Sequence, residues 1–128
     1  MNGTAAIRVL LVDDNPLVRQ VLTQMLLAHP EIEVVGQSST GEEALSCVET
    51  LQPQVVVMDI RMPRMDGVTA TREIGLRYPD VKVIGLTEHA DDYHADALKR
   101  AGALAVYHKS KATEELYRAI KRTVRPDV

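Results

Sequence analysis

Five short runs of apolar, mostly β-branched residues alternate along the chain with longer segments in which apolar residues recur every three or four positions. Short apolar runs predict buried strands, and the three-to-four spacing predicts amphipathic helices. The runs show little alternation of apolar and polar residues, which is typical of parallel strands covered on both faces. The predicted strands are Ile7–Val12, Ile32–Gly36, Val55–Met58, Val81–Leu86 and Leu104–Tyr107.

Capping residues predict where the helices between these strands begin and end. Asn15 followed by Pro16 is a strong helix start. Thr40 begins a capping-box pattern, Asp66 precedes a third helix, and Gly102 is typical of a helix end. The fourth helix is predicted at about Asp91–Ala101 and the fifth at about Thr113–Val124. The residues predicted to face the core are Leu17, Val18, Val21, Leu22, Met25 and Leu26 in the first helix; Ala44, Leu45, Val48 and Leu51 in the second; Val68, Thr71 and Ile74 in the third; and Leu116, Ala119, Ile120 and Val124 in the fifth. This alternation predicts an α/β fold with a doubly wound, five-stranded parallel sheet.

Polar side chains with matching chemistry follow four of the predicted strands. Asp13 and Asp14 follow the first strand, Asp59 the third, Thr87 the fourth and Lys109 the fifth. Open α/β sheets bind ligands outside the carboxyl ends of their strands. Three neighbouring carboxylates are best tolerated when a cation neutralises them, and oxygen ligands suit Mg²⁺. The sequence therefore predicts a site for Mg²⁺ and a phosphoryl group.

Composition limits the remaining possibilities. The 128 residues form one domain, 45% of them hydrophobic, and without Phe or Trp the core must be aliphatic. A net charge of −3 does not favour direct nucleic-acid binding, which needs a basic face. The single Cys47 excludes an internal disulfide and fits a reducing cytoplasm. No stretch resembles a membrane span or an export leader, and the polar tail 123–128 is expected to be a linker stub to an absent output domain.

Four segments occur along the chain in the order L-V-D-D-N-P, V-M-D-I-R-M-P-R-M-D-G, G-L-T-E-H and A-G-A-L-A-V-Y-H-K-S. Together they resemble the receiver domain of two-component response regulators. The resemblance covers roughly Ile7 to Val124, so residues 1–128 are expected to be one receiver domain. The chain looks most like the NarL/FixJ-type (LuxR-type helix-turn-helix) transcriptional regulators in two motifs, M-D-I-R-M-P-x-M-D-G and the C-terminal E-E-L-x-R-A-I. The resemblance implies a flavodoxin-like (βα)5 fold with strand order 2-1-3-4-5.

The resemblance also implies a role for each residue of the predicted site. The implied Mg²⁺ ligands are Asp14 and Asp59 directly, Asp13 through water, and the backbone carbonyl of Arg61. Asp59 is the implied nucleophile, which forms an aspartyl phosphate, with Thr87 as the switch hydroxyl and Lys109 as the partner of the phosphoryl group. The implied partners are a histidine kinase or phosphotransfer protein, a second copy on phosphorylation, and DNA through a C-terminal output domain. Enzyme activity beyond self-catalysed phosphoryl transfer and autodephosphorylation is not expected.

Three positions depart from the family pattern. Val106 replaces the usual aromatic, and strand alternation is expected to point Tyr107 to the opposite face. Ser110 replaces a proline common in the family. Glu88 follows the switch threonine, where its carboxylate is expected to repel an incoming phosphoryl group. The histidines show no metal-site spacing and are predicted to lie on the surface: His29, His89, His94 and His108. By resemblance, His89 also rims the site, as does Arg61.

Three alternative functions can be compared with the residues of this chain. A phosphatase of the haloacid-dehalogenase type also uses an aspartyl phosphate, but it needs an Asp two residues after the nucleophile, where this chain has Arg61. A flavodoxin-like cofactor binder needs a phosphate loop after the first strand, where Asp-Asp-Asn-Pro would repel a flavin phosphate. A phosphorylation-independent interaction module of receiver fold is kept open by Glu88 and Val106.

Overall fold

Five parallel strands form one sheet in the order β2-β1-β3-β4-β5, in a computed structural model that describes residues 6–62, 64–88 and 92–124. The elements are β1 (Ile7–Val12), α1 (Pro16–Leu27), β2 (Ile32–Ser38), α2 (Gly41–Leu51), β3 (Val55–Asp59), α3 (Gly67–Arg77), β4 (Lys82–Thr87), α4 (Asp92–Ala101), β5 (Ala105–His108), a 3₁₀ turn (Lys109–Lys111) and α5 (Ala112–Val124). The predicted fold class and strand order are confirmed.

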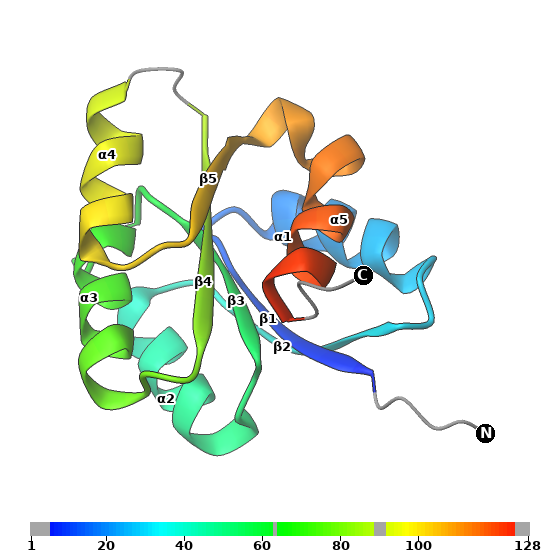
Figure 1. Cartoon of the computed structure of the whole chain (residues 1–128), viewed down its shortest axis with the longest axis horizontal. Helices are drawn as coiled ribbons and strands as arrows, with labels where there is room; N and C mark the ends of the chain where they lie inside the picture. The colour runs from blue at the N-terminus through cyan, green and yellow to red at the C-terminus, as the bar shows by residue number, and fades with distance from the viewer. Residues whose placement is uncertain (1–5, 63, 89–91, 125–128) are drawn as a thin grey trace.

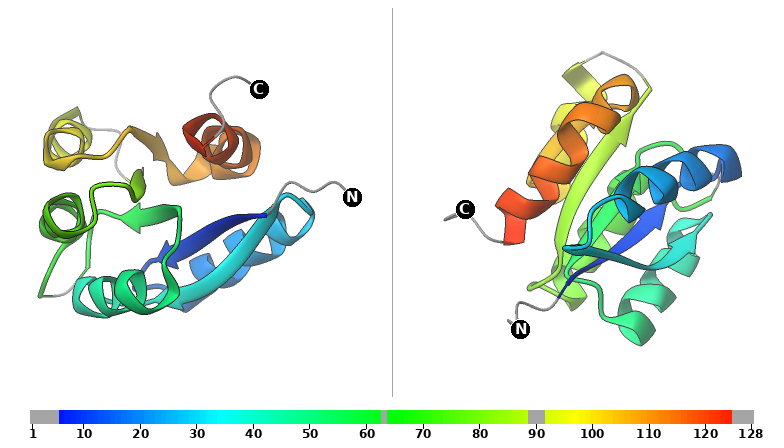
Figure 2. Two further views of the ribbon diagram at one scale, coloured as in Figure 1. Left: turned by 60° about the horizontal axis from the view of Figure 1, so that its bottom comes forward. Right: turned by 90° about the vertical axis from the view of Figure 1, so that its right-hand side faces the viewer.

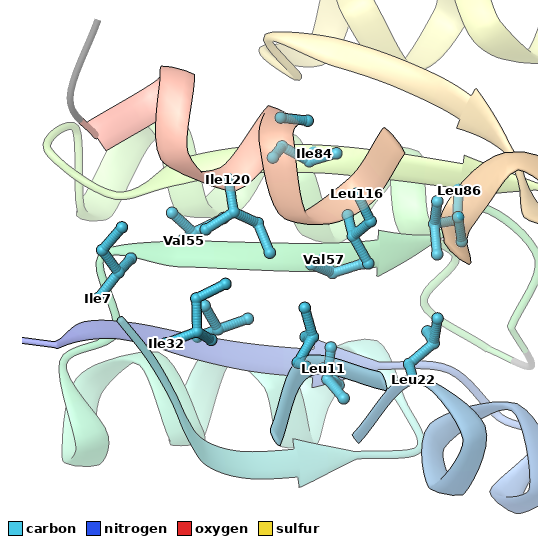
Figure 3. Packing of buried hydrophobic residues seen from close by; sticks show 14 residues of the cluster. Ile7, Leu11, Leu22, Ile32, Val55, Val57, Ile84, Leu86, Leu116 and Ile120 are labelled. Carbon is cyan, nitrogen blue, oxygen red and sulfur yellow. The ribbon is translucent and has the colours of Figure 1, made fainter. Parts of the chain in front are cut away.

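Helices cover both faces of the sheet. Figure 1 shows α2, α3 and α4 on one face and α1 and α5 on the other, and Figure 2 shows the same layers from two further sides. Each face has its own aliphatic core, because successive residues of a strand point to opposite faces. In β1, for example, Val9 and Leu11 belong to the core under α1 and α5, whereas Leu10 and Val12 belong to the other. Figure 3 shows Leu116 of α5 packed above the central strands.

The first helix is less buried than its apolar stripe predicts. Leu22 and Leu26 are buried, but Leu17 is 64% and Val21 50% exposed. Both residues border a gap between α1 and α5 that the two helices do not close. Leu51 at the end of α2 is also exposed rather than buried. These three predictions of core positions were wrong, because helical periodicity shows that a face is apolar but not how far its neighbours extend over it.

Three strands run one residue further than predicted, which places site residues inside the sheet. Asp59 is the last residue of β3 and pairs with Leu86, and Thr87 is the last residue of β4 and pairs with His108. Hydrogen-bonded strand ends hold these side chains more firmly than a loop would.

The C-terminal helix reaches into the segment that was expected to be a linker stub. Helix α5 continues to Val124, so the first two residues of the expected linker stub are helical, and 125–128 lie outside the described residues. Helix α4 begins at Asp92 and ends before Gly102, whose φ of 127° is a backbone conformation that favours glycine. No helix within residues 6–62, 64–88 and 92–124 is long and apolar enough to cross a membrane.

Candidate functional site

The three predicted carboxylates meet at one rim of the sheet. Asp13, Asp14 and Asp59 each offer a carboxylate oxygen, and these oxygens lie within 4.8 Å of one another. They converge because β1 and β3 are neighbours, with Val12 paired to Met58 just before the acidic residues. Asp13 and Asp59 are buried, whereas Asp14 is exposed to solvent. This arrangement concentrates negative charge at the switch point of the sheet, where a cation would be favoured.

Lys109 supplies the positive charge at this rim. Its Nζ lies 2.7 Å from Asp13 Oδ2, 3.4 Å from Asp59 Oδ1 and 3.3 Å from Glu88 Oε1. The side chain is only 14% exposed, so its ion pairs with the buried acids are weakly screened by solvent. The ammonium therefore stands where it can contact a group attached to Asp59.

The electrostatics of Asp59 follow from its burial. Burial and the neighbouring Asp13 charge raise the pKa of Asp59 from 3.8 to about 7, although Lys109 and a hydrogen bond from the Arg61 backbone N–H pull it down. Burial lowers the pKa of Lys109, but the hydrogen bond to Asp13 and the charges of Asp59 and Asp13 outweigh it, so that the net shift is upward. The lysine stays charged, while the Asp59 carboxylate is costly to ionise without a further cation.

The backbone around Asp59 explains the Asp66-Gly67 sequence. A Cβ on Gly67 would lie 2.1 Å from the Asp59 carbonyl oxygen, which is impossible without moving the chain. The Gly67 N–H also donates to the Ile60 carbonyl at 2.8 Å. Asp66 caps α3 by accepting from the Thr69 N–H at 2.8 Å. The predicted cap at Asp66 is confirmed, and Gly67 lets the loop fold tightly against the end of β3.

A cavity of about 200 Å³ opens beside Asp59. The residues that line it are Asp14, Asp59, Ile60, Arg61, Thr87 and Glu88. Because a water molecule takes about 30 Å³ of liquid volume, the cavity has room for several water-sized groups. The fold therefore brings together the six residues predicted for metal binding and phosphoryl transfer. Asp13, Asp14, Asp59, Arg61 and Thr87 belong to the acidic group or line the cavity, and Lys109 contacts two of the acids.

The donor set fits Mg²⁺. Asp13 Oδ2 is buried and has the Lys109 ammonium as its partner at 2.7 Å, on the same rim as two further carboxylates. Buried carboxylate oxygens in proteins usually have a hydrogen-bond donor or a metal as partner. Together with the oxygens of Asp14 and Asp59, this group offers the hard oxygen ligands that Mg²⁺ prefers.

Sequence reasoning missed the contacts of two residues next to the site. Glu88 was expected to repel a phosphoryl group, but its carboxylate is paired with Lys109. His108 was predicted to be a surface residue, but it is partly buried and its Nε2 lies 2.9 Å from the Glu88 carbonyl oxygen. His29 is likewise partly buried and stacks on Tyr117 at 3.5 Å. Neither histidine has a spacing in the sequence that signals these contacts, and His89 lies outside the described residues.

The predicted directions of the β5 side chains are confirmed. Val106 packs on the core under α2, α3 and α4, whereas Tyr107 packs on the core under α1 and α5. Arg122 of α5 donates a hydrogen bond to the Tyr107 hydroxyl at 3.3 Å. At the usual aromatic position, the α4 side of β5 therefore carries an aliphatic side chain.

Comparison with known proteins agrees with this geometry. Residues 9–121 match the response regulator receiver domain, and the chain belongs to this family. It is 38% identical over 115 residues to the transcriptional regulatory protein DegU of Brevibacillus brevis, which covers 90% of this chain and 49% of DegU. A solved LuxR-family two-component response regulator from Aurantimonas sp. SI85-9A1 superposes with a TM-score of 0.89 at 30% identity, covering 95% of this chain and 87% of that one.

The chain spans about half the length of DegU, and the remainder of such proteins varies. A protein-glutamate methylesterase/protein-glutamine glutaminase from Myxococcus xanthus is 40% identical over 109 residues, which is 84% of this chain but 31% of that protein. The relatives thus include transcriptional regulators and an enzyme. This chain is the receiver domain of a two-component response regulator, and the phosphatase and flavodoxin-like alternatives are not favoured.

Proposed function

We propose that this domain is a phosphoacceptor switch in which Asp59 receives a phosphoryl group from a histidine kinase or phosphotransfer protein. The observation that carries the proposal is the position of Lys109, 3.4 Å from Asp59 Oδ1 and 2.7 Å from Asp13 Oδ2, at a rim that also holds Asp14. A buried acid and base alone could be a structural ion pair. A third carboxylate and a cavity lined by Thr87 have no such explanation.

Each residue then has a defined task. Mg²⁺ would neutralise charge on the transferring oxygens. Asp14 and Asp59 would hold it directly, Asp13 through water, and Arg61 through its backbone carbonyl. A carboxylate oxygen of Asp59 forms a bond to phosphorus as the bond between phosphorus and the donor imidazole nitrogen breaks. The Lys109 ammonium pairs with a phosphoryl oxygen, and the Thr87 hydroxyl donates to another.

The phosphoryl donor needs a surface on which to dock next to Asp59. An apolar groove of about 250 Å³ lies between α1 and α5, and Lys109 is one of the residues that line it. Its lining residues are Leu17, Val18, Val21, Leu22, Leu86, Lys109, Ala112 and Thr113. The exposure of Leu17 and Val21 supports this groove as the place where a helix of the donor packs, because large apolar side chains gathered on a surface often mark an interface.

The proposed switch would control a DNA-binding output domain. Transcriptional relatives such as DegU support a DNA-binding domain that follows α5 in the whole protein, with no direct nucleic-acid contact by this domain. On phosphorylation, the face made by α4, β5 and α5 would change its contacts, with homodimerisation as one consequence. Such a regulator would act in the cytoplasm and would have no enzymatic activity beyond its own phosphorylation and autodephosphorylation.

The first experiment measures phosphorylation directly. The domain is incubated with acetyl phosphate and Mg²⁺, and the intact mass is followed for the wild type, Asp59→Asn and Asp66→Asn. Asp66→Asn is the matched control, because it also removes a nearby carboxylate but keeps a good helix cap. We expect label on the wild type and on Asp66→Asn only. Label on Asp59→Asn, or equal labelling in EDTA, would refute the proposal.

A phosphorylation-independent interaction module is the alternative, which the comparisons do not favour, although one contact is compatible with it. Glu88 already gives Lys109 a third carboxylate partner at 3.3 Å, so the lysine is compensated before any phosphoryl group arrives. The same labelling experiment separates the two functions. A wild type that takes no phosphate from acetyl phosphate or from a histidine kinase would favour the interaction module.

A further inference from the structure

His108, the last residue of β5, and Lys109, the first residue of the turn after it, both contact Glu88. His108 Nε2 lies 2.9 Å from the Glu88 carbonyl oxygen, and Lys109 Nζ lies 3.3 Å from Glu88 Oε1. The first contact holds the backbone of Glu88 and the second holds its side chain. Figure 1 shows where this occurs, at the upper ends of the neighbouring strands β4 and β5.

The hydrogen bonds of His108 identify its tautomer. The Ser110 N–H donates to His108 Nδ1 at 3.1 Å, and Ser110 Oγ lies 2.8 Å from the same nitrogen. A neutral imidazole has one donor and one acceptor, so Nε2 carries the hydrogen and donates to Glu88. Both ring nitrogens are engaged, which fixes the orientation of the ring.

This connection depends on the positions at which the chain departs from its family. A proline in place of Ser110 would have no N–H for His108, and a small residue in place of Glu88 would have no carboxylate for Lys109. Val106, at the usual aromatic position, has a side chain that forms no hydrogen bonds. Ser110 therefore orients the ring that contacts the Glu88 backbone, and the Glu88 carboxylate adds a separate contact with Lys109.

We propose that His108 is a positioning residue that holds Glu88, and with it Thr87, in the resting conformation of the domain. The release of this hold rests on the proposed phosphorylation of Asp59. Up to about two negative charges added at Asp59 draw the Lys109 ammonium away from Glu88. The Glu88 carboxylate is 63% exposed, so its contact with Lys109 is weak and water readily replaces it.

The hydrogen bond from His108 then still restrains the backbone of Glu88. Thr87 and Glu88 are linked by one peptide bond and line the same cavity, so Thr87 cannot move far into it unless the Glu88 backbone also moves. A contact present only in the resting state favours that state by its own free energy. Loss of the His108 contact therefore shifts the population toward the activated conformation.

Two isosteric substitutions separate the hydrogen bonds of His108. In His108→Gln the side-chain amide nitrogen takes the place of Nε2 and still reaches the Glu88 carbonyl. In His108→Asn the side-chain oxygen takes the place of Nδ1 and still accepts from Ser110, but the amide is too short to reach Glu88. The two variants are matched in chemistry, and each keeps one of the two contacts of His108 and loses the other.

The first measurement needs no phosphoryl group. Amide hydrogen exchange of the unphosphorylated domain reports on the end of β4 and the start of α4. We expect His108→Asn to exchange about 3- to 10-fold faster there than the wild type, which corresponds to the ~0.7–1.4 kcal/mol of one hydrogen bond, and His108→Gln to stay within about twofold. Equal exchange in the two variants would overturn the proposal. Their urea unfolding curves should coincide, which separates positioning from general stability.

The second measurement tests release. Beryllofluoride, a phosphoryl mimic, is titrated in Mg²⁺ and followed by amide NMR. We expect His108→Asn to bind it about 3- to 10-fold more tightly than the wild type and His108→Gln with nearly wild-type affinity. Equal or weaker binding by His108→Asn would overturn the release step. If the wild type binds no mimic and takes no phosphate, the proposed function fails, whereas the exchange experiment still decides whether His108 holds the loop.

Discussion

The charge on Asp59 should destabilise the metal-free domain, and Asp59→Asn should remove that cost. Burial and Asp13 raise the pKa of Asp59 from 3.8 to about 7. The folded state therefore holds the proton more tightly than the unfolded chain. The sign follows by linkage: the free energy of unfolding falls as the pH rises from about 4 to about 7, because ionisation over this range is easier in the unfolded state.

The size of this effect can be bounded from the shift. A difference of about 3 pKa units corresponds to about 4 kcal/mol at most. Asp59 lies at a rim beside the exposed Asp14 and a cavity open to water, so solvent screening should reduce the cost to about 1–2 kcal/mol. We expect Asp59→Asn to be more stable than the wild type by that amount at pH 8, and nearly equal to it near pH 4.

The assay is urea unfolding followed by far-UV circular dichroism between pH 4 and 8, in EDTA and in Mg²⁺. In EDTA the gap between the variant and the wild type should open as the pH rises. Mg²⁺ should close it at pH 8 by stabilising the wild type. Asp66→Asn, which removes a charge outside the buried pair, should show no such gap. A gap that is the same at every pH would refute the electrostatic explanation and point to packing.

Three other substitutions test the remaining contacts. Lys109→Ala should still fold in Mg²⁺ but lose about 1.5–3 kcal/mol of charge-assisted contact with a phosphoryl mimic, so a normal beryllofluoride-induced NMR shift would contradict its role. Glu88→Ala should label with acetyl phosphate about fivefold faster at low salt, since removing ~1 kcal/mol of repulsion and freeing the lysine both favour the phosphoryl group. Equal rates would leave Glu88 without a kinetic role. Gly67→Ala should cost at least ~2 kcal/mol in urea unfolding and slow labelling, because its Cβ would meet the Asp59 carbonyl oxygen at 2.1 Å; wild-type stability would contradict the close approach.

Local patterns in the sequence were sufficient to predict that Asp13, Asp14, Asp59, Thr87 and Lys109 follow strand ends at one rim of the sheet. Four of the strands are apolar runs that end in a polar site residue or are followed by one, and the carboxyl ends of parallel strands share one rim. This rule brings Asp13, Asp59 and Lys109 together without any knowledge of distances, and the structure places them within ion-pair range. Asn15 and Asp66 could likewise be recognised as caps, because a helix cap involves only neighbouring residues.

The contacts that set the resting state depend on the tertiary structure alone. Glu88 and Lys109 lie far apart in the sequence, and they meet because the register of β4 and β5 pairs Thr87 with His108. That register also gives His108 a backbone carbonyl to bind, which no property of an isolated histidine indicates. The exposure of Leu17 depends in the same way on the gap between α1 and α5. Local periodicity determines which face of an element is apolar, whereas long-range packing determines what that face meets.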